Sequence, residues 1–206
     1  MKVFIPTTML HIQTSLLFKK MGYTLVNLPE EADIIVFTGG EDINPELYCQ
    51  RKCEYTYFSP SRDEFEVSLY NEFPNKLFVG ICRGAQLLSA LKGGDIVQHI
   101  NSVHKGYHPV MYKNEKVMVN SLHHQAIIVN NRMKVLMAED TPLQGIVFHY
   151  DSNNEEENLF YCVDMFKQEN VFGVQFHPEL MDIKERAVGI FQNELNTFIE
   201  ERLCAA

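Results

Sequence analysis

The sequence predicts an α/β fold: an open, mostly parallel sheet flanked by helices on both faces, with an antiparallel extension. In the first half of the chain, short apolar runs alternate with segments of helical periodicity, which is typical of a parallel sheet covered by helices. In the second half, strand-like segments follow one another with turns between them, which indicates antiparallel pairing. No linker, repeat or low-complexity segment divides the 206 residues, so we expect one domain over residues 1–206.

The first half supplies the expected parallel strands and the helices between them. Residues 14–22 have apolar positions at helical spacing and end on a glycine, a residue favoured just past a helix C-terminus. Residues 61–73 predict a helix in which Ser61 and Glu64 form a capping box, and residues 83–94 predict a helix closed by glycines. Four segments rich in β-branched and aromatic residues predict strands: 2–6, 23–28, 33–40 and 76–81.

The second half consists mainly of expected strands. The acidic tract 151–158 predicts a solvated hairpin loop, and a metal-binding role for it is disfavoured because it lacks glycine-punctuated ligand spacing. An amphipathic helix over residues 182–203 is expected to close the fold. Seven segments predict strands: 95–100, 108–112, 116–122, 134–139, 143–150, 159–166 and 171–176.

Composition narrows the partners and the compartment. The 18 basic and 27 acidic residues give a net charge of −9, which disfavours nucleic-acid and anionic-membrane partners. No apolar run approaches the roughly 20 residues of a membrane-spanning helix, and the N-terminal residues do not form a secretory signal. An odd count of cysteines without tight pairing indicates reduced thiols, so we expect a soluble, cytoplasmic protein. The five cysteines are Cys49, Cys53, Cys82, Cys162 and Cys204.

The segment KLFVGICRGAQLL, residues 76–88, places Cys82 at the corner between an expected strand and an expected helix. The pattern G-x-C-x-G is the layout of a nucleophile elbow, in which Gly80 and Gly84 avoid clashes at a very tight turn. A helix N-terminus favours a thiolate there, and the Arg83 N–H is positioned to stabilise an oxyanion. Cysteine is also common as a small core residue, and the elbow pattern alone does not decide between the two interpretations.

A candidate base lies near the end of the chain in VFGVQFHPEL, residues 171–180. His177 follows an expected strand, and Glu179 lies two residues further on. Residues two apart in an extended or turning segment can point the same way, so the Glu179 carboxylate can accept a hydrogen bond from the His177 ring. That bond would set the tautomer and stabilise the imidazolium. Together with Cys82, this spacing predicts a Cys–His–Glu triad.

The two motifs GICRGAQLL and GVQFHPE resemble those of the triad-type, or class I, glutamine amidotransferase superfamily. The resemblance implies an open, mostly parallel sheet flanked by helices, with Cys82 as nucleophile, His177 as general acid and base, and Glu179 as orienting carboxylate. The segment FTGGEDINPELY, residues 37–48, is similar to the gamma-glutamyl hydrolases, including those that cleave gamma-glutamyl-gamma-aminobutyrate. Its glycine pair lets the backbone approach a ligand, so the Gly40 N–H is the expected second oxyanion donor.

The segment VNSLHHQAI, residues 119–127, also resembles the hydrolase branch. The resemblance implies that it lies beside the nucleophile and holds the alpha-amino and alpha-carboxylate groups of the glutamyl unit. The hydroxyl, imidazole and amide groups of Ser121, His123 and Gln125 suit that role. Gln86 matches the glutamine that holds the glutamyl unit in the family motif.

Three further expectations concern charged side chains and histidines. The charge of Arg83 is expected to face the leaving group, whereas Arg62 and Asp63 are expected to cap a helix and brace a loop. A zinc site built from His123, His124 and the triad histidine is an alternative that the spacing disfavours, because H-H-Q is not a ligand spacing of a helix or hairpin. The expected chemistry needs no metal or organic cofactor.

The sequence therefore predicts a cysteine-dependent hydrolase that cleaves the gamma-glutamyl amide bond of a small glutamylated metabolite. Glutamate and an amine or amidate would leave through a glutamyl-thioester intermediate. One alternative is a glutaminase subunit that delivers ammonia to a separate synthetase, and a triad-bearing binding or regulatory protein without turnover is another. A synthetase or ligase of the same pathway is the expected protein partner.

Overall fold

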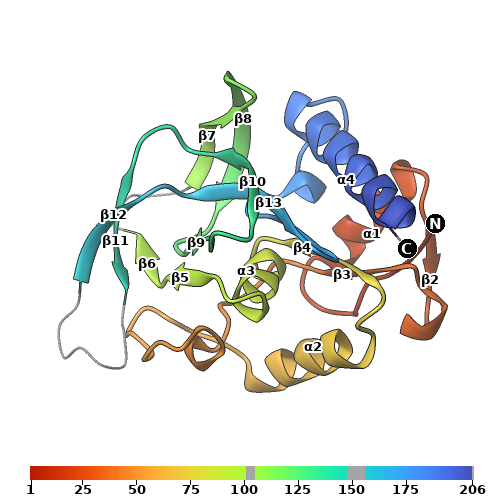
Figure 1. Ribbon diagram of the computed structural model, residues 1–206, viewed down its shortest axis with the longest axis horizontal. Coiled ribbons are helices and arrows are strands. Elements are labelled where there is room, and N and C mark those ends of the chain that lie inside the picture. The colour runs from red at the N-terminus through yellow and green to blue at the C-terminus, as the bar shows by residue number, and fades with distance from the viewer. Residues whose placement is uncertain (101–104, 148–155, 206) are drawn as a thin grey trace.

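The computed structural model describes residues 1–100, 105–147 and 156–205, and a nine-stranded sheet crosses it in the order β2-β1-β3-β4-β14-β13-β10-β7-β8 (Figure 1). The five strands from β2 to β14 are parallel, and each pairing beyond β14 is antiparallel. The predicted sheet with its antiparallel extension is confirmed. In sheet order the strands are Thr24–Val26, Lys2–Phe4, Ile34–Phe37, Leu77–Ile81, Val171–Val174, Val163–Gln168, Lys134–Ala138, Lys105–Tyr112 and Glu115–Leu122.

Helices cover both faces of the parallel half, as predicted. α1 (His11–Lys20) and α4 (Arg186–Ala205) pack on one face, and α2 (Pro60–Glu72) and α3 (Arg83–Leu91) lie on the other (Figure 1). The central strands are consequently apolar at every position, because a strand between two helical layers has no solvent face.

Strand β3 illustrates how the residues divide between the two cores. Ile34 and Val36 join the cluster under α1 and α4, while Ile35 and Phe37 join the cluster under α2 and α3. All four side chains are fully buried. The period-two alternation of a strand therefore stabilises both layers at once.

Two small sheets extend the second half of the chain. β5 (Asp95–Val97) pairs with β9 (Ala126–Ile128), and a three-stranded sheet has the order β12-β11-β6. β6 spans His99–Ile100, β11 spans Leu143–Val147 and β12 spans Glu156–Phe160. A third apolar cluster packs between them: Val97, Ile100, Ala126, Val147, Phe160 and Cys162.

Two of the predicted strands are in fact pairs of strands. Residues 95–100 form β5 and β6, which belong to different sheets, and Gln98 lies between them. Buried Gln98 hydrogen-bonds Arg51 O and the Cys53 N–H, so side-chain bonds to a neighbouring loop take the place of strand pairing there. Residues 159–166 divide in the same way between β12 and β13. β9 was not predicted as a separate strand.

The predicted capping box of the second helix is wrong. α2 begins at Pro60, so Ser59 is its N-cap and Ser61 already lies in the first turn. Proline is well suited to that first helical position because its fixed φ matches the helix and its missing N–H is not needed. Ser59 makes no side-chain capping bond, and the side chain of Asp63 accepts a hydrogen bond from the Asn44 N–H at 3.0 Å.

The remaining helix predictions differ only at their ends. The helix expected over 14–22 begins at His11 and ends before Gly22, whose φ of 90° suits the turn that follows. In the described part of the chain, no helix is both long enough and apolar enough to span a membrane. The expected acidic loop falls mainly on residues outside the described ranges, and its last positions, 156–158, lie in β12.

Candidate active site

Cys82 lies at the sharp corner between β4 and α3, at the carboxyl end of the parallel strands. Its φ of 51° and ψ of −108° form a backbone conformation that non-glycine residues rarely adopt. The Cys82 N–H donates to Val174 O at 2.7 Å, which anchors the corner to β14, and the residue is 5% exposed. Strain of this kind is what a nucleophile elbow requires, since the turn projects the side chain above the strand ends.

The glycines on either side of Cys82 are required by close packing. A Cβ on Gly84 would lie 2.2 Å from the Phe37 carbonyl oxygen of β3, and one on Gly80 would lie 2.4 Å from the Gly84 carbonyl carbon. Both contacts are with backbone, which cannot move aside as a flexible side chain can. The predicted reason for glycine at these two positions is confirmed.

His177 and Glu179 follow β14 and lie close enough to act as a unit. The His177 Nδ1–H donates to Glu179 Oε1 at 2.7 Å, and the two side chains are 4% and 0% exposed. Pro178 begins a short 3₁₀ helix, Pro178–Leu180, which turns Glu179 back towards the ring. Because a carboxylate can only accept, this bond assigns the proton to Nδ1 and leaves Nε2 for the thiol.

The electrostatics of His177 favour its protonated form. Burial opposes that charge and lowers the pKa of His177, but the interactions of the ring with Cys82 and with the Glu179 carboxylate raise the pKa to about 10. The pKa of His177 is therefore raised overall. The structure thus brings Cys82 and the bonded His177–Glu179 pair together beyond the carboxyl ends of β4 and β14.

Asn120 on β8 fixes the backbone of His177, and this contact was not expected from the sequence. Its Oδ1 accepts from the His177 N–H at 2.8 Å, and its Nδ2 donates to the His177 carbonyl at 2.9 Å. The side chain therefore satisfies both backbone groups of His177 beyond the end of β14. The only signal in the sequence was that Asn120 lies within the segment 119–127.

Two buried glutamines reach Cys82 from neighbouring elements. Gln175 Nε2 donates to Cys82 Sγ at 3.5 Å, and Gln86 Nε2 donates to Gln175 Oε1 at 3.2 Å. Gln86, expected to bind substrate, is thus linked to the nucleophile through Gln175. The role of Gln175 was missed, although it lies in the quoted motif GVQFHPE.

The glycine turn after β3 packs directly against the triad histidine. A Cβ on Gly39 would approach His177 Cε1 to 2.7 Å. Gly40 has a φ of 153°, and a Cβ there would lie 2.2 Å from Arg62 Nη1. Arg62 Nη2 donates to the carbonyls of Thr38 at 3.0 Å and Gly39 at 3.1 Å. Arg62 accordingly braces this turn, as expected, while the Gly40 N–H as an oxyanion donor stays a prediction.

The expectation that the Arg83 side chain faces the leaving group is wrong. Arg83 is fully buried, and its guanidinium pairs with Asp63 at 2.5 Å and with Glu66. A guanidinium without water needs carboxylate partners, and α2 presents two of them one turn apart. Asp63 also holds the Asn44 N–H, so its expected bracing role is seen. The Arg83 backbone N–H as an oxyanion donor stays a prediction.

The three other expected substrate-binding residues lie in and after β8. Ser121 is 2% exposed, His123 Nδ1–H donates to Gln125 O at 2.8 Å, and Gln125 Nε2 donates to Thr56 Oγ1 at 3.3 Å. Their segment is anchored beside His177 through Asn120. Their role towards a substrate stays a prediction.

The alternative zinc site gains no support from the geometry. His124 Nε2 lies 3.0 Å from Asp42 Oδ1, whereas His123 bonds its own loop. Over the described ranges, these two residues and His177 do not gather into a set of possible metal ligands.

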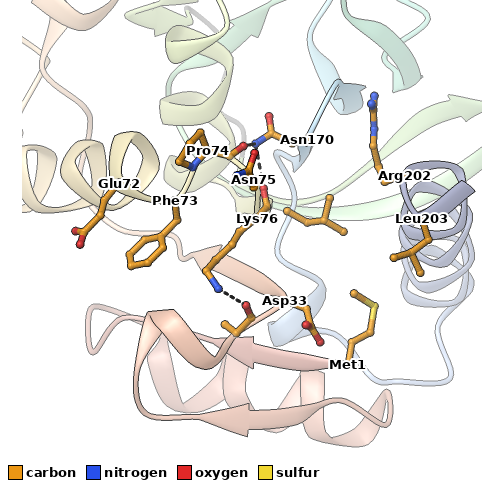
Figure 2. Close-up of a pocket in the computed structure, with 12 residues that line it drawn as sticks. Met1, Asp33, Glu72, Phe73, Pro74, Asn75, Lys76, Asn170, Arg202 and Leu203 are labelled. Atoms are coloured by element: carbon orange, nitrogen blue, oxygen red, sulfur yellow. Dashed lines mark hydrogen bonds between the residues drawn. The ribbon is translucent and has the colours of Figure 1, made fainter. Parts of the chain in front are cut away.

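A surface pocket of about 680 Å³ lies at the opposite edge of the sheet (Figure 2). Met1, Asp33 and Leu77 line it at the amino ends of β1, β3 and β4, and Arg202 contributes from the end of α4. Cys82 follows the carboxyl end of β4. The pocket is therefore separate from the triad.

Comparisons with known proteins agree with this geometry. The Peptidase C26 family profile matches residues 15–110. The glutamine amidotransferase-like protein YvdE homolog of Lactococcus lactis subsp. cremoris is 30% identical, over 53% of this chain and 77% of that protein. The gamma-glutamyl-CDP-amidate hydrolase of Campylobacter jejuni is 25% identical, over 70% of this chain and 61% of its own. A glutamine amidotransferase of Thermotoga maritima shares the fold with a TM-score of 0.60 and 16% identity, covering 95% and 84%.

Proposed function

Because this chain belongs to the glutamine amidotransferase-like proteins and matches the Peptidase C26 family, we propose that it hydrolyses the gamma-glutamyl amide bond of a small metabolite. Membership in a peptidase family supports a hydrolase. The observation that carries the finer proposal is the strained Cys82 elbow, which meets a buried His177–Glu179 pair joined at 2.7 Å.

The proposed reaction begins at the Cys82 thiolate. Its sulfur attacks the gamma-carbonyl carbon, and the new oxyanion accepts hydrogen bonds from the backbone N–H groups of Gly40 and Arg83. The carbon–nitrogen bond then breaks as the His177 imidazolium donates its Nε2 proton to the leaving nitrogen. The products of this half-reaction are the free amine or amidate and a glutamyl thioester on Cys82.

Water completes the cycle through the same histidine. Neutral His177 accepts a proton from water, and the water oxygen attacks the thioester carbon. The carbon–sulfur bond breaks, glutamate leaves, and the thiolate–imidazolium pair is restored. Glu179 keeps the ring oriented throughout, since its bond to Nδ1 is independent of the proton carried on Nε2.

A panel of gamma-glutamyl amides tests the proposal. Glutamate release would be measured for substituted amides and for free glutamine, with Cys82→Ala and the control Cys204→Ala. Cys204 is exposed on the last turn of α4, so its loss should leave the rate unchanged. Loss of a catalytic nucleophile costs roughly a thousandfold or more, and that loss is expected for Cys82→Ala. Full activity in Cys82→Ala would refute covalent catalysis.

The glutaminase alternative gives a different pattern in the same assay. The relatives named as glutamine amidotransferase-like proteins are the observation that favours it. An isolated glutaminase subunit would turn over free glutamine slowly and substituted amides not at all, and a synthetase partner would accelerate it. Fast cleavage of one substituted amide would identify the hydrolase and its leaving group.

A further inference from the structure

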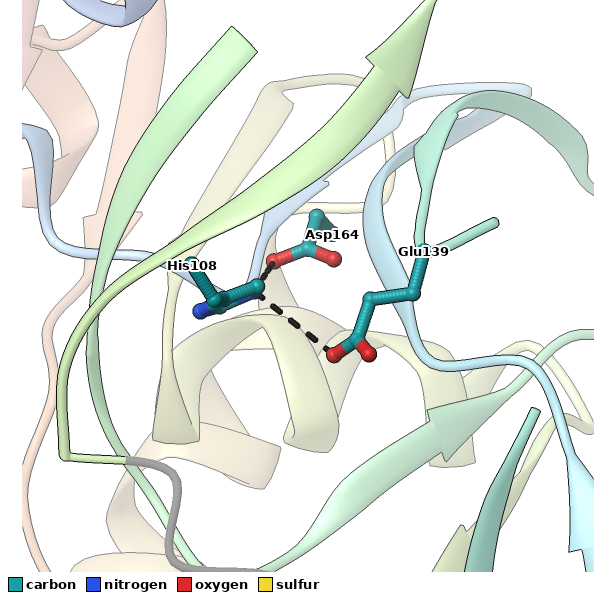
Figure 3. A group of neighbouring side chains, drawn as sticks. All are labelled: His108, Glu139 and Asp164. Carbon is teal, nitrogen blue, oxygen red and sulfur yellow. Dashed lines mark ion pairs between the residues drawn. The ribbon is translucent and has the colours of Figure 1, made fainter. Parts of the chain in front are cut away.

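A second cluster of reactive side chains lies in the antiparallel half of the sheet. His108 comes from β7, Glu139 directly follows β10, and Asp164 comes from β13 (Figure 3). These three strands are neighbours, with β10 in the middle. The three side chains converge on one point although His108 and Asp164 lie 56 positions apart in the sequence.

The spacing of the three donor atoms fits a single metal ion. His108 Nε2 lies 3.5 Å from Asp164 Oδ1 and 3.6 Å from Glu139 Oε1, and all three donor atoms lie within 4.8 Å of one another. Ligand atoms around a tetrahedral ion with bonds of about 2.1 Å are about 3.4 Å apart. These separations are too long for good hydrogen bonds but need only small side-chain movements to surround an ion.

Asp164 is the strongest sign that a cation belongs here. Its side chain is fully buried, and neither of its oxygens accepts a hydrogen bond from any residue that the structure describes. A buried carboxylate without hydrogen bonds is costly, and its ion pair with His108 at 3.5 Å compensates it only in part.

A register shift between β10 and β13 directs the Asp164 side chain into the cluster. Met137 pairs with Met165 and Ala138 pairs with Val163, so Asp164 has no partner residue on β10. An extra residue of this kind is a β-bulge, which commonly redirects a side chain next to a functional site. Figure 3 shows the Asp164 carboxylate directed towards His108 and Glu139.

We propose that His108, Glu139 and Asp164 form a binding site for one divalent transition-metal ion, with water completing the coordination. One imidazole and two carboxylates are donors that Zn²⁺, Co²⁺ and Mn²⁺ accept. The two negative charges of the carboxylates balance the two positive charges of a divalent ion. The site is distinct from the triad, and its chemistry does not depend on the proposed hydrolysis.

The metal site adjoins the segment that follows β8. The ring of His108 meets the ring of His123 edge-on, with centroids 6.5 Å apart. A metal ion on Nε2 of His108 would fix the orientation of this ring and so of its contact with His123. Metal binding is therefore expected to order the His123 loop, which anchors beside His177 through Asn120.

Co²⁺ is the probe of choice, because its spectrum reports its donor atoms. The full chain would be freed of metal with a chelator, dialysed and titrated with CoCl₂. We expect one ion per chain, visible d–d bands and no thiolate charge-transfer band, with Zn²⁺ competing with Co²⁺ for the site. Absence of binding, or a strong thiolate band that reports cysteine ligands, would overturn the proposal.

Isosteric variants assign the ion to this cluster. Asp164→Asn and Glu139→Gln preserve side-chain shape, and circular dichroism would verify folding. Loss of even an outer-shell partner costs about 10- to 100-fold in metal affinity, so loss of a direct ligand should weaken Co²⁺ binding by about 100-fold or more. Asp42→Asn is the matched control, since Asp42 pairs with a different histidine, His124. The assignment would be refuted if Asp164→Asn and Glu139→Gln bound Co²⁺ as tightly as the unmodified protein does. If Asp164→Asn fails to fold, the Co²⁺ affinity of Glu139→Gln decides.

Discussion

His177 is the residue on which the proposed chemistry depends, because Cys82 and Glu179 both raise its pKa. Glu179 holds Nδ1, and the interactions of the ring with Cys82 and Glu179 raise the pKa of His177 against the cost of burial. A ring that keeps its proton can protonate a poor leaving group such as an amine. Asn120 adds a constraint on the backbone, and the ring is therefore placed before any substrate arrives.

Glu179→Gln should shift the pH dependence of the reaction. The amide can still accept a bond from His177 but carries no charge, so the pKa of His177 falls. As pH rises, the ring then loses its proton earlier, and the alkaline limb of kcat/KM moves to lower pH. The rate should fall by about 10²- to 10⁴-fold, the usual contribution of general acid–base catalysis.

The pH profile of alkylation of Cys82 by iodoacetamide measures the same shift without a substrate. Glu64→Gln, on the exposed face of α2, is the matched control and should leave the profile unchanged. An alkaline limb that stays in place in Glu179→Gln would mean that Glu179 does not control the charge of His177.

At the scale of the elements, a buried ion-pair network joins the start of α2 to the start of α3. Arg83 pairs with Asp63 and Glu66, and Glu66 also accepts from Arg62 Nε at 3.0 Å. Arg62 in turn holds the Thr38 and Gly39 carbonyls. The same buried ion-pair network therefore holds both the corner at Cys82 and the glycine turn after β3.

Arg83→Met should destabilise the fold strongly. It removes the cation and leaves Asp63 without that partner in a water-free position, and breaking a buried pair costs about 3–5 kcal/mol. Urea unfolding followed by circular dichroism measures the change. Arg186→Met is the control, because Arg186 and its partner Glu115 are both exposed and such a pair contributes about 0–1 kcal/mol. Equal losses in the two variants would show that the buried network has no special role in stability.

Packing of α3 against β3 gives a prediction about glycine. In Gly84→Ala the new Cβ would overlap the Phe37 carbonyl, so we expect destabilisation of about 1–3 kcal/mol. In Gly189→Ala the new Cβ meets no atom within 4 Å, and glycine inside α4 costs about 0.5–1 kcal/mol relative to alanine, so that variant should be more stable. Thermal unfolding of both variants measures whether each is more or less stable than the unmodified protein. A stabilised Gly84→Ala would contradict the observed packing.

At the scale of the whole molecule, sheet order assembles the site. β4 lies between β3 and β14, so the glycine turn, Cys82 and His177 all follow the carboxyl ends of three adjacent parallel strands. This edge of an open α/β sheet is where ligands bind. The pocket near Met1 opens at the other edge and shares no residue with the triad.

Much of this architecture was predictable from local pattern. Strands buried on both faces are continuous apolar runs, and the helices between them carry apolar stripes, so the parallel half was identified correctly. The antiparallel half was predicted less well, because short strands such as β5 and β6 are separated by a single buried polar residue, Gln98, whose partners lie in a distant loop. The capping box failed for a similar reason, since Pro60 moved the start of α2 upstream of Ser61.

Local pattern was enough to predict the elbow and the His-x-Glu pair, because both depend on residues within a few positions of one another. Steric limits at G-x-C-x-G and the short reach from His177 to Glu179 act locally. Local pattern could not predict the burial of Arg83, the hydrogen bonds of Asn120 to His177 or the convergence of His108, Glu139 and Asp164. Those contacts join strands and helices far apart in the chain, and strand order and bulges, which no local pattern records, bring them together.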